Sequence, residues 1–170
     1  MEMTGLDPAT CVPIEVAIIV SSPDLDELDS FHTVIHQDEA ALASMSDFVR
    51  NMHTDNGLLD KVRAEKTTLA EAERGMIEIL RSWCEPGSGV LSGNSIHQDR
   101  RFTARYFPQF DRLLHYRMVD VSTIKELIKR WYGPDTLYEK PESDHTALAD
   151  VKQSIAELEY YRERFLADAG

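Results

Sequence analysis

The pattern of apolar and polar positions predicts strands in the first part of the chain and mostly helices after them. Residues 13–20 are apolar and β-branched, and the turn residues at 21–24 follow directly, so we predict a strand there. Residues 31–36 alternate between apolar and polar types, which predicts a second strand paired with the first in a hairpin. Short helical pieces, broken by polar clusters, are expected between residues 38 and 60.

The next segment carries a clear helical period. From Thr68 onward the apolar residues recur on one helical face, and Glu71 stands in the first turn, where the helix dipole favours an acid. The Pro-Gly-Ser-Gly sequence at 86–89 ends that helix, and a short buried strand is expected at 90–91. The later elements are expected to be a helix at 99–107, a strand at 118–121, a helix capped by Ser122 that runs to residue 131, and a final helix at 145–166.

The order of these elements predicts the fold class. Strands come first and strand–helix alternation follows, which indicates an α/β protein with a mixed sheet flanked by helices. The 170 residues fit one domain, 1–170. Such a sheet requires a central strand before Glu2, so we expect the first central strand to be largely missing from this chain.

Composition limits the partners. The formal net charge of −12 argues against binding to long nucleic acids, although a small anionic substrate held by a few local cations stays open. Cys11 and Cys84 form no metal-binding or CxxC spacing, which favours a reducing compartment. The sequence shows neither a signal peptide nor an apolar run of the roughly 18 residues that a membrane helix needs, so we expect a soluble, cytoplasmic protein without a membrane partner.

Four polar residues stand out as candidate chemistry: Glu2, Asp99, His145 and Asp150. Glu2 lies where a strand gives way to a tight turn, a common place for a carboxylate that holds a divalent cation. Each residue alone also has a structural explanation, such as a terminal surface acid, a first-turn acid or a residue at a helix start. The spacing His-x4-Asp by itself identifies nothing.

Five sequence strings, taken together and in order, identify a family. They are MEMTGLDP (1–8), GNSIHQDRRF (93–102), HYRMVDVSTIKEL (115–127), HTALADV (145–151) and AELEYYRERF (156–165). They resemble the oligoribonuclease family, in the DEDDh class of 3′→5′ exonucleases, over nearly the whole chain. The resemblance implies a ribonuclease H-like fold and a single exonuclease domain. It also implies the pattern Asp-x-Glu, then Asp, then His-x4-Asp.

The resemblance assigns roles to the four candidates. Glu2, Asp99 and Asp150 would be catalytic carboxylates that bind two divalent ions, Mg²⁺ or Mn²⁺, which prefer hard oxygen ligands. His145 would be the general base, since an imidazole has an unperturbed pKa of about 6.5. The reaction would release 5′-mononucleotides from the 3′ end of short RNA.

The resemblance also implies a substrate site for dinucleotides. Leu6 would wedge beside the bases and Phe48 would stack on one of them, in the place of a tryptophan. Tyr116 would be contributed by a partner subunit, which implies a homodimer. The full set of substrate-binding positions is Thr4, Gly5, Leu6, Phe48, His53, Ser95, Tyr116, Arg117 and Ser122. Two of these have structural alternatives, because Phe48 could belong to the core and Arg117 could pair with a surface acid.

The first Asp of the family pattern has no counterpart, since its position would precede Met1. Three explanations stay open: a start further upstream, an altered chain that cuts poorly, or a strand supplied by another chain. We favour the first, because every downstream motif is intact. The leading function is therefore a short-RNA exonuclease, and the alternative is a module that binds short RNA or nucleotides without efficient cleavage. The strings GNSIHQD and HYRMVDVST weigh against a proofreading-type DNA exonuclease.

Overall fold

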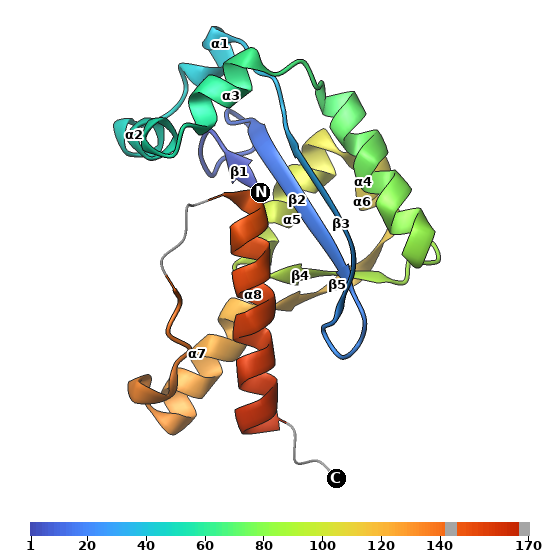
Figure 1. The fold of residues 1–170 in the computed structure, drawn as a ribbon, viewed down its shortest axis with the longest axis vertical. Coiled ribbons are helices and arrows are strands. Elements are labelled where there is room, and N and C mark those ends of the chain that lie inside the picture. The colour runs from blue at the N-terminus through green and yellow to red at the C-terminus, as the bar shows by residue number, and fades with distance from the viewer. Residues whose placement is uncertain (142–145, 167–170) are drawn as a thin grey trace.

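The computed structural model describes residues 1–141 and 146–166, and its strands form two separate sheets (Figure 1). In the first sheet, β1 (Glu2–Met3), β2 (Pro13–Ser21) and β3 (Glu27–Val34) lie antiparallel in the order β1-β2-β3. In the second, β4 (Gly89–Gly93) and β5 (Leu114–Asp120) pair in parallel. The predicted α/β class is confirmed, with the antiparallel and parallel pairings in different sheets.

Helices cover the strands on more than one side. Figure 1 shows α4 alongside β3 and the upper end of α8 beside β2, and both helices contact β2. The helical elements are α1 (Glu39–Leu42), α2 (Asp47–Asp55), α3 (Leu58–Ala64), α4 (Leu69–Trp83), α5 (Ile96–Tyr106), α6 (Pro108–Asp111), α7 (Val121–Tyr132), η1 (Pro134–Thr136), α8 (Ala147–Tyr161) and η2 (Arg162–Leu166). No helix in the described ranges is both long enough and apolar enough to cross a membrane.

Both faces of β2 are covered by helices. Successive side chains of a strand point to opposite faces. Val16 belongs to the core cluster that contains Met76 of α4, whereas the neighbouring Glu15 contacts Ala147 at the start of α8. Because both faces of β2 meet a helix, its sequence reads as a nearly continuous apolar run rather than an alternating one.

Several local predictions are confirmed and others are corrected. The hairpin of β2 and β3 is confirmed, and Thr68 and Glu71 form a reciprocal capping box at the start of α4. The predicted cap at Ser122 is wrong: Asp120 is the N-cap of α7, and its carboxylate accepts the amide of Ser122. The strand at 90–91 is not buried, since the side chain of Val90 is exposed. The short helix α6 was not predicted.

The first strand of the sheet is short. β1 holds two residues, with Glu2 opposite Glu15 and Met3 opposite Pro13. It pairs only with the first part of β2, and no strand in the described part of the chain joins β2 to β4.

Candidate active site

Glu2 meets a buried histidine at the end of β1. The carboxylate oxygen Oε2 of Glu2 lies 3.8 Å from Nε2 of His53, whose side chain is fully buried on α2. The same ring nitrogen donates to the carbonyl of Met3 at 3.3 Å, and Nδ1 has no hydrogen-bond partner among the residues described. Burial lowers the pKa of His53, so the ring is neutral near pH 7. His53 therefore lies beside the acid rather than at an open phosphate pocket.

The carboxyl group of Glu2 is in an unfavourable place for a negative charge. Its side chain is 14% exposed, and burial is the main cause that raises its pKa to about 7. The charges of Asp150, Glu15 and Asp99 raise the pKa further, while the Met1 ammonium group lowers it. Asp99 and Asp150 thus both lie within electrostatic reach of Glu2.

Asp99 and Asp150 border the same cavity. Each stands in the first turn of its helix, Asp99 on α5 and Asp150 on α8, where an acid is favoured. A cavity of about 930 Å³ is lined by both acids together with Met1. The nitrogen of Met1 lies 3.3 Å from Oδ1 of Asp99. His145, the expected general base, lies outside the residues that the structure describes.

The donor set suits a divalent cation in its chemistry. Glu2, whose pKa is raised by burial and by the charges of Asp150, Glu15 and Asp99, would gain from a nearby dication. Carboxylate oxygens are the ligands that Mg²⁺ and Mn²⁺ prefer. Their geometry is looser: within residues 1–141 and 146–166, no three Asp, Glu, His or Cys side chains lie close enough to hold one ion. By their chemistry, Glu2, Asp99 and Asp150 are the groups that would hold a metal. In this structure their side chains are too far apart to bind one ion together.

Glu15 also supports this site, although no sequence motif selects it as a functional residue. Glu15 of β2 is buried, and its Oε2 accepts the amide N–H of Ala147 at 2.8 Å. Its Oε1 accepts from Nε2 of His32 at 2.7 Å. Glu15 thereby fastens the first turn of α8, which carries Asp150, to the sheet. The available signal was one charged residue inside an otherwise apolar strand.

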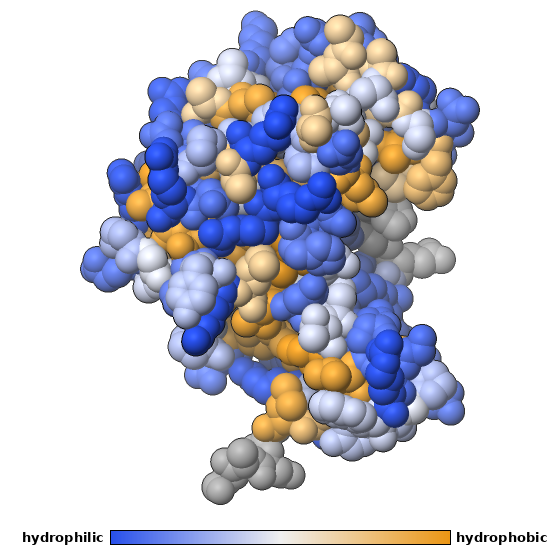
Figure 2. Space-filling view, turned by 180° about the vertical axis from the view of Figure 1, so that it is seen from behind, coloured by the Kyte–Doolittle hydropathy of each residue, from blue (hydrophilic) through white to orange (hydrophobic). Residues whose placement is uncertain are grey.

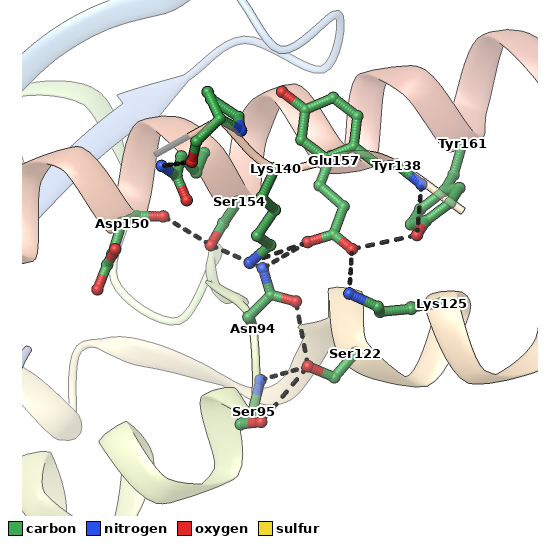
Figure 3. A network of polar contacts seen from close by, with 12 residues as sticks. Asn94, Ser95, Ser122, Lys125, Tyr138, Lys140, Asp150, Ser154, Glu157 and Tyr161 are labelled. Carbon is green, nitrogen blue, oxygen red and sulfur yellow. Dashed lines mark hydrogen bonds and ion pairs between the residues drawn. The ribbon is translucent and has the colours of Figure 1, made fainter. Parts of the chain in front are cut away.

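Ser95 and Ser122 form a second group, between α5 and α7 (Figure 3). Their hydroxyl oxygens lie 3.4 Å apart, and the amide of Ser95 donates to Oγ of Ser122 at 3.0 Å. The carboxylate of Asp120 accepts the amides of both serines at 3.0 Å and lies 3.5 Å from Nδ1 of His97. The two helix starts thus share one internal acid, and the hydroxyl groups face each other beside it.

A buried carboxylate holds the Ser95 loop in place, and no sequence pattern indicates it. Glu157 of α8 is fully buried and accepts from Asn94 at 3.0 Å, while Lys125 and Lys140 each approach it to 3.2 Å. The amide oxygen of Asn94 in turn accepts from the hydroxyl of Ser122 at 3.1 Å. Figure 3 shows these residues converging from α7, α8 and the loop after β4. Nothing in sequence distinguishes this acid from the surface acids of α8.

The two expected base-stacking residues are exposed. Phe48 is 77% exposed and Leu6 is 65% exposed, so both side chains are free to meet a base. The alternative that placed Phe48 in the core is wrong.

Two of the three residues between Glu2 and Leu6, Thr4 and Gly5, have structural tasks. The hydroxyl of Thr4 is buried and accepts the amide of Val12 at 3.0 Å. A Cβ atom on Gly5 would lie only 2.7 Å from Sγ of Cys11, so close packing requires a glycine there. Both residues fix the turn that presents Leu6.

The last two expected substrate residues, Tyr116 and Arg117, lie on β5. Tyr116 is exposed, and the guanidinium carbon of Arg117 lies 5.3 Å from its ring centroid. Arg100 has a structural partner, since its Nε lies 2.8 Å from Oδ1 of Asp111.

Comparison with known proteins agrees with this architecture. The chain is 46% identical to an oligoribonuclease of Burkholderia lata over 170 residues, which cover 99% of this chain and 82% of that protein. It is 46% identical to an oligoribonuclease of Corynebacterium glutamicum (strain R), covering 97% of this chain and 77% of the relative. A solved structure of a moderately thermophilic exonuclease I from Methylocaldum szegediense shares the fold, with a TM-score of 0.69 at 18% identity; the match covers 96% of this chain and 39% of that one.

The family assignment rests on the extent of these matches. The family model described as exonuclease, RNase_T, matches residues 1–158. That range contains β1 with Glu2, the α5 turn with Asp99 and the α8 turn with Asp150. The chain belongs to the RNase_T exonuclease family.

Proposed function

We propose that this protein is a 3′→5′ exoribonuclease that hydrolyses short oligoribonucleotides, above all dinucleotides, to 5′-mononucleotides. The observation that carries the proposal is that Asp99 and Asp150, both far from Glu2 in sequence, lie close enough to raise the pKa of the Glu2 carboxyl in a chain of this family. The two relatives of 46% identity are named oligoribonucleases, which supports short RNA as the substrate.

The carboxylates would hold two divalent ions, Mg²⁺ or Mn²⁺, which when bound activate a water and stabilise the leaving oxygen of the phosphodiester. Glu2, whose pKa is raised to about 7 chiefly by burial, would have to lose its proton for this. His145 would take the proton of the attacking water. Glu15 positions Asp150 through the start of α8.

The size of the substrate would be limited by the serine group. Ser95 and Ser122 would donate their hydroxyls to the 5′ phosphate, at the start of α5, where the helix dipole favours an anion. Arg117 would add a positive charge, and Leu6 and Phe48 would hold the bases from the exposed side. The net charge of −12 fits a substrate too short to need an extended basic track.

A homodimer would complete the site. Apolar side chains stay exposed along β5 and α7, including Tyr116 and Trp131, which are 73% and 69% exposed. Figure 2 shows apolar atoms gathered in a band on the face opposite to that of Figure 1, and large exposed apolar patches commonly mark interfaces. In such a dimer Tyr116 would reach the partner's substrate. Both cysteines are free thiols, which supports a reducing compartment such as the cytoplasm.

One observation favours the alternative, in which the chain binds short RNA or nucleotides without efficient cleavage. The acids of the described ranges do not form a three-ligand group. A site with two well-placed carboxylates would hold metal weakly while leaving Phe48 and the serine group free to bind.

Turnover of a ribodinucleotide decides between these functions. We expect release of 5′-mononucleotides in Mg²⁺ or Mn²⁺, loss of the reaction with a chelator, and a loss of about a hundredfold or more in Asp150→Asn. Asp135→Asn, an exposed acid of η1, is the matched control and should keep full activity. Binding without product would establish the alternative. Faster cleavage of the deoxyribodinucleotide would instead indicate a DNA exonuclease.

A further inference from the structure

Asn94 joins the helix that carries Asp150 to the serine group of Ser95 and Ser122 (Figure 3). The amide nitrogen of Asn94 donates to Oγ of Ser154 at 3.0 Å, and the hydroxyl of Ser154 donates to the carbonyl of Asp150 at 2.8 Å. The amide oxygen of Asn94 accepts from the hydroxyl of Ser122 at 3.1 Å. One side chain in the loop after β4 therefore connects α8, with its candidate metal ligand, to the start of α7.

The orientation of the Asn94 amide is fixed by Glu157. The amide nitrogen of Asn94 donates to Oε2 of Glu157 at 3.0 Å, and an ionised carboxylate can only accept. The amide nitrogen therefore faces α8, which leaves the amide oxygen to face Ser122. Glu157 is fully buried, and the ammonium groups of Lys125 and Lys140, each 3.2 Å from its carboxylate, stabilise its charged form.

The bond to Asn94 fixes the position of the Ser122 oxygen, and that oxygen in turn fixes Ser95. Oγ of Ser122 accepts the amide N–H of Ser95 at 3.0 Å. Ser95 is exposed and has a left-handed backbone with a φ of 51°, a conformation that a serine keeps only where its surroundings hold it. The two hydroxyl oxygens lie 3.4 Å apart, so a phosphate group, with its several acceptor oxygens, can meet both hydroxyls at once.

We propose that Asn94, oriented by Glu157, is a positioning residue that sets the preference of this site for short RNA with a 5′ phosphate. The inference rests on the proposed function, which assigns that phosphate to the serine group. Asn94 does not itself touch the phosphate. It holds the two hydroxyl oxygens side by side, and through Ser154 it keeps them at a constant place relative to α8. The 5′ phosphate of a dinucleotide and its scissile phosphate are then bound at a fixed separation.

Calorimetric titration with a non-hydrolysable ribodinucleotide, with and without a 5′ phosphate, tests the inference. The parent should bind the phosphorylated ligand more tightly, and Asn94→Ala should reduce this preference, the ratio of the two Kd values, by about tenfold. The Kd of the ligand without the phosphate should change little. Glu159→Gln, an exposed acid of α8, is the control and should keep the preference of the parent. An unchanged preference in Asn94→Ala, or equal weakening of both ligands, would overturn the inference.

An exchange of the two side chains separates positioning from folding. Asn94→Asp places a second carboxylate against that of Glu157 and should lose the preference. The double variant Asn94→Asp/Glu157→Gln exchanges amide and carboxylate, so an N–H···O bond can again join the two positions at the net charge of the parent. It should regain most of the lost preference. A double variant that unfolds at the temperature of the parent but shows no preference would assign Asn94 to folding alone and overturn the inference.

Turnover separates this inference from the proposed function. A parent that cleaves ribodinucleotides but binds both ligands equally would keep the exonuclease function and overturn the role of Asn94. A parent that cleaves neither ribodinucleotide, while Asn94→Ala still loses the preference in binding, would support the role of Asn94 in a protein that binds short RNA without cleavage.

Discussion

The amide N–H of Ala147 donates a hydrogen bond of 2.8 Å to Oε2 of Glu15, across 132 positions of sequence. The other carboxylate oxygen of Glu15 receives Nε2–H of His32 at 2.7 Å. One buried acid on β2 thus joins the hairpin to the first turn of α8. Since Asp150 lies in that turn, the geometry of a candidate metal ligand depends on a residue that would never touch the metal.

Glu15→Ala should therefore destabilise the protein. It leaves the amide of Ala147 and the ring of His32 without their acceptor, and a buried donor left unpaired costs about 1–3 kcal/mol. Urea denaturation measures the change in the free energy of unfolding. Glu139→Ala removes an exposed acid and should stay within about 0.5 kcal/mol of the parent. Equal stability of the two variants would show that Glu15 does not fasten α8.

Glu157 should make stability depend on acid pH. Burial pushes the pKa of Glu157 up, but the hydrogen bond from Asn94 and the charges of Lys140 and Lys125 outweigh burial and hold it below the ordinary value of 4.5. A carboxyl group whose folded pKa is lowered stabilises the protein above its unfolded pKa, and this stabilisation is lost as the pH falls through the folded pKa. The advantage of the parent over Glu157→Gln should thus be full at pH 6 and shrink below about pH 4.5.

Thermal unfolding of both proteins between pH 6 and pH 3 measures this advantage. Glu159→Gln, an exposed acid two residues along α8, is the control and should follow the parent at every pH. A gap between the parent and Glu157→Gln that stays constant across this range would contradict the assignment of the pH dependence to Glu157.

The sequence predicted those parts of the fold that repeat a local pattern. The apolar run of β2 and the period of α4 with its Thr68 cap were read correctly, because strand and helix periods are properties of neighbouring residues. The cap of α7 was assigned to Ser122 instead of Asp120. Both residue types cap helices, and only the backbone angle of Asp120 separates them.

The supporting acids of the site could not be predicted in the same way. Glu15 and Glu157 have ordinary surface-acid identities, and their burial is decided by partners more than a hundred and about sixty positions away, Ala147 and Asn94. The family strings located Glu2, Asp99 and Asp150, yet they gave no sign that His53 lies 3.8 Å from Glu2. Long-range pairing of polar groups leaves no period in a sequence.

Glu2 should lower the stability of the metal-free protein at neutral and alkaline pH. Burial, with Asp150, Glu15 and Asp99 nearby, raises its pKa to about 7, against an ordinary value of 4.5. The unfolded chain then releases this proton at lower pH than the folded chain, so the free energy of unfolding falls as the pH rises from about 4.5 to about 7. With a chelator present at pH 8, Glu2→Gln should be more stable than the parent by roughly 1–3 kcal/mol.

Denaturation at pH 5 and at pH 8 tests whether Glu2→Gln raises or lowers the free energy of unfolding. The gain in Glu2→Gln should vanish at the lower pH, where Glu2 is protonated in the folded protein. Mg²⁺ in place of the chelator should stabilise the parent at pH 8 more than the variant, because a bound ion stabilises only the state that binds it. A variant that is less stable than the parent at pH 8 without metal would contradict the raised pKa.

Phe48 should affect substrate binding without affecting the fold. Its ring is 77% exposed on α2, so Phe48→Ala removes little packing, whereas the loss of base stacking should weaken binding of a non-hydrolysable ribodinucleotide by roughly 1–3 kcal/mol. Phe48→Trp enlarges the stacking surface and should tighten binding. Leu28→Ala, another exposed apolar side chain, on β3, should leave the Kd unchanged. Calorimetric titration measures all four proteins, and the same Kd for Phe48→Ala as for the parent would remove Phe48 from the substrate site.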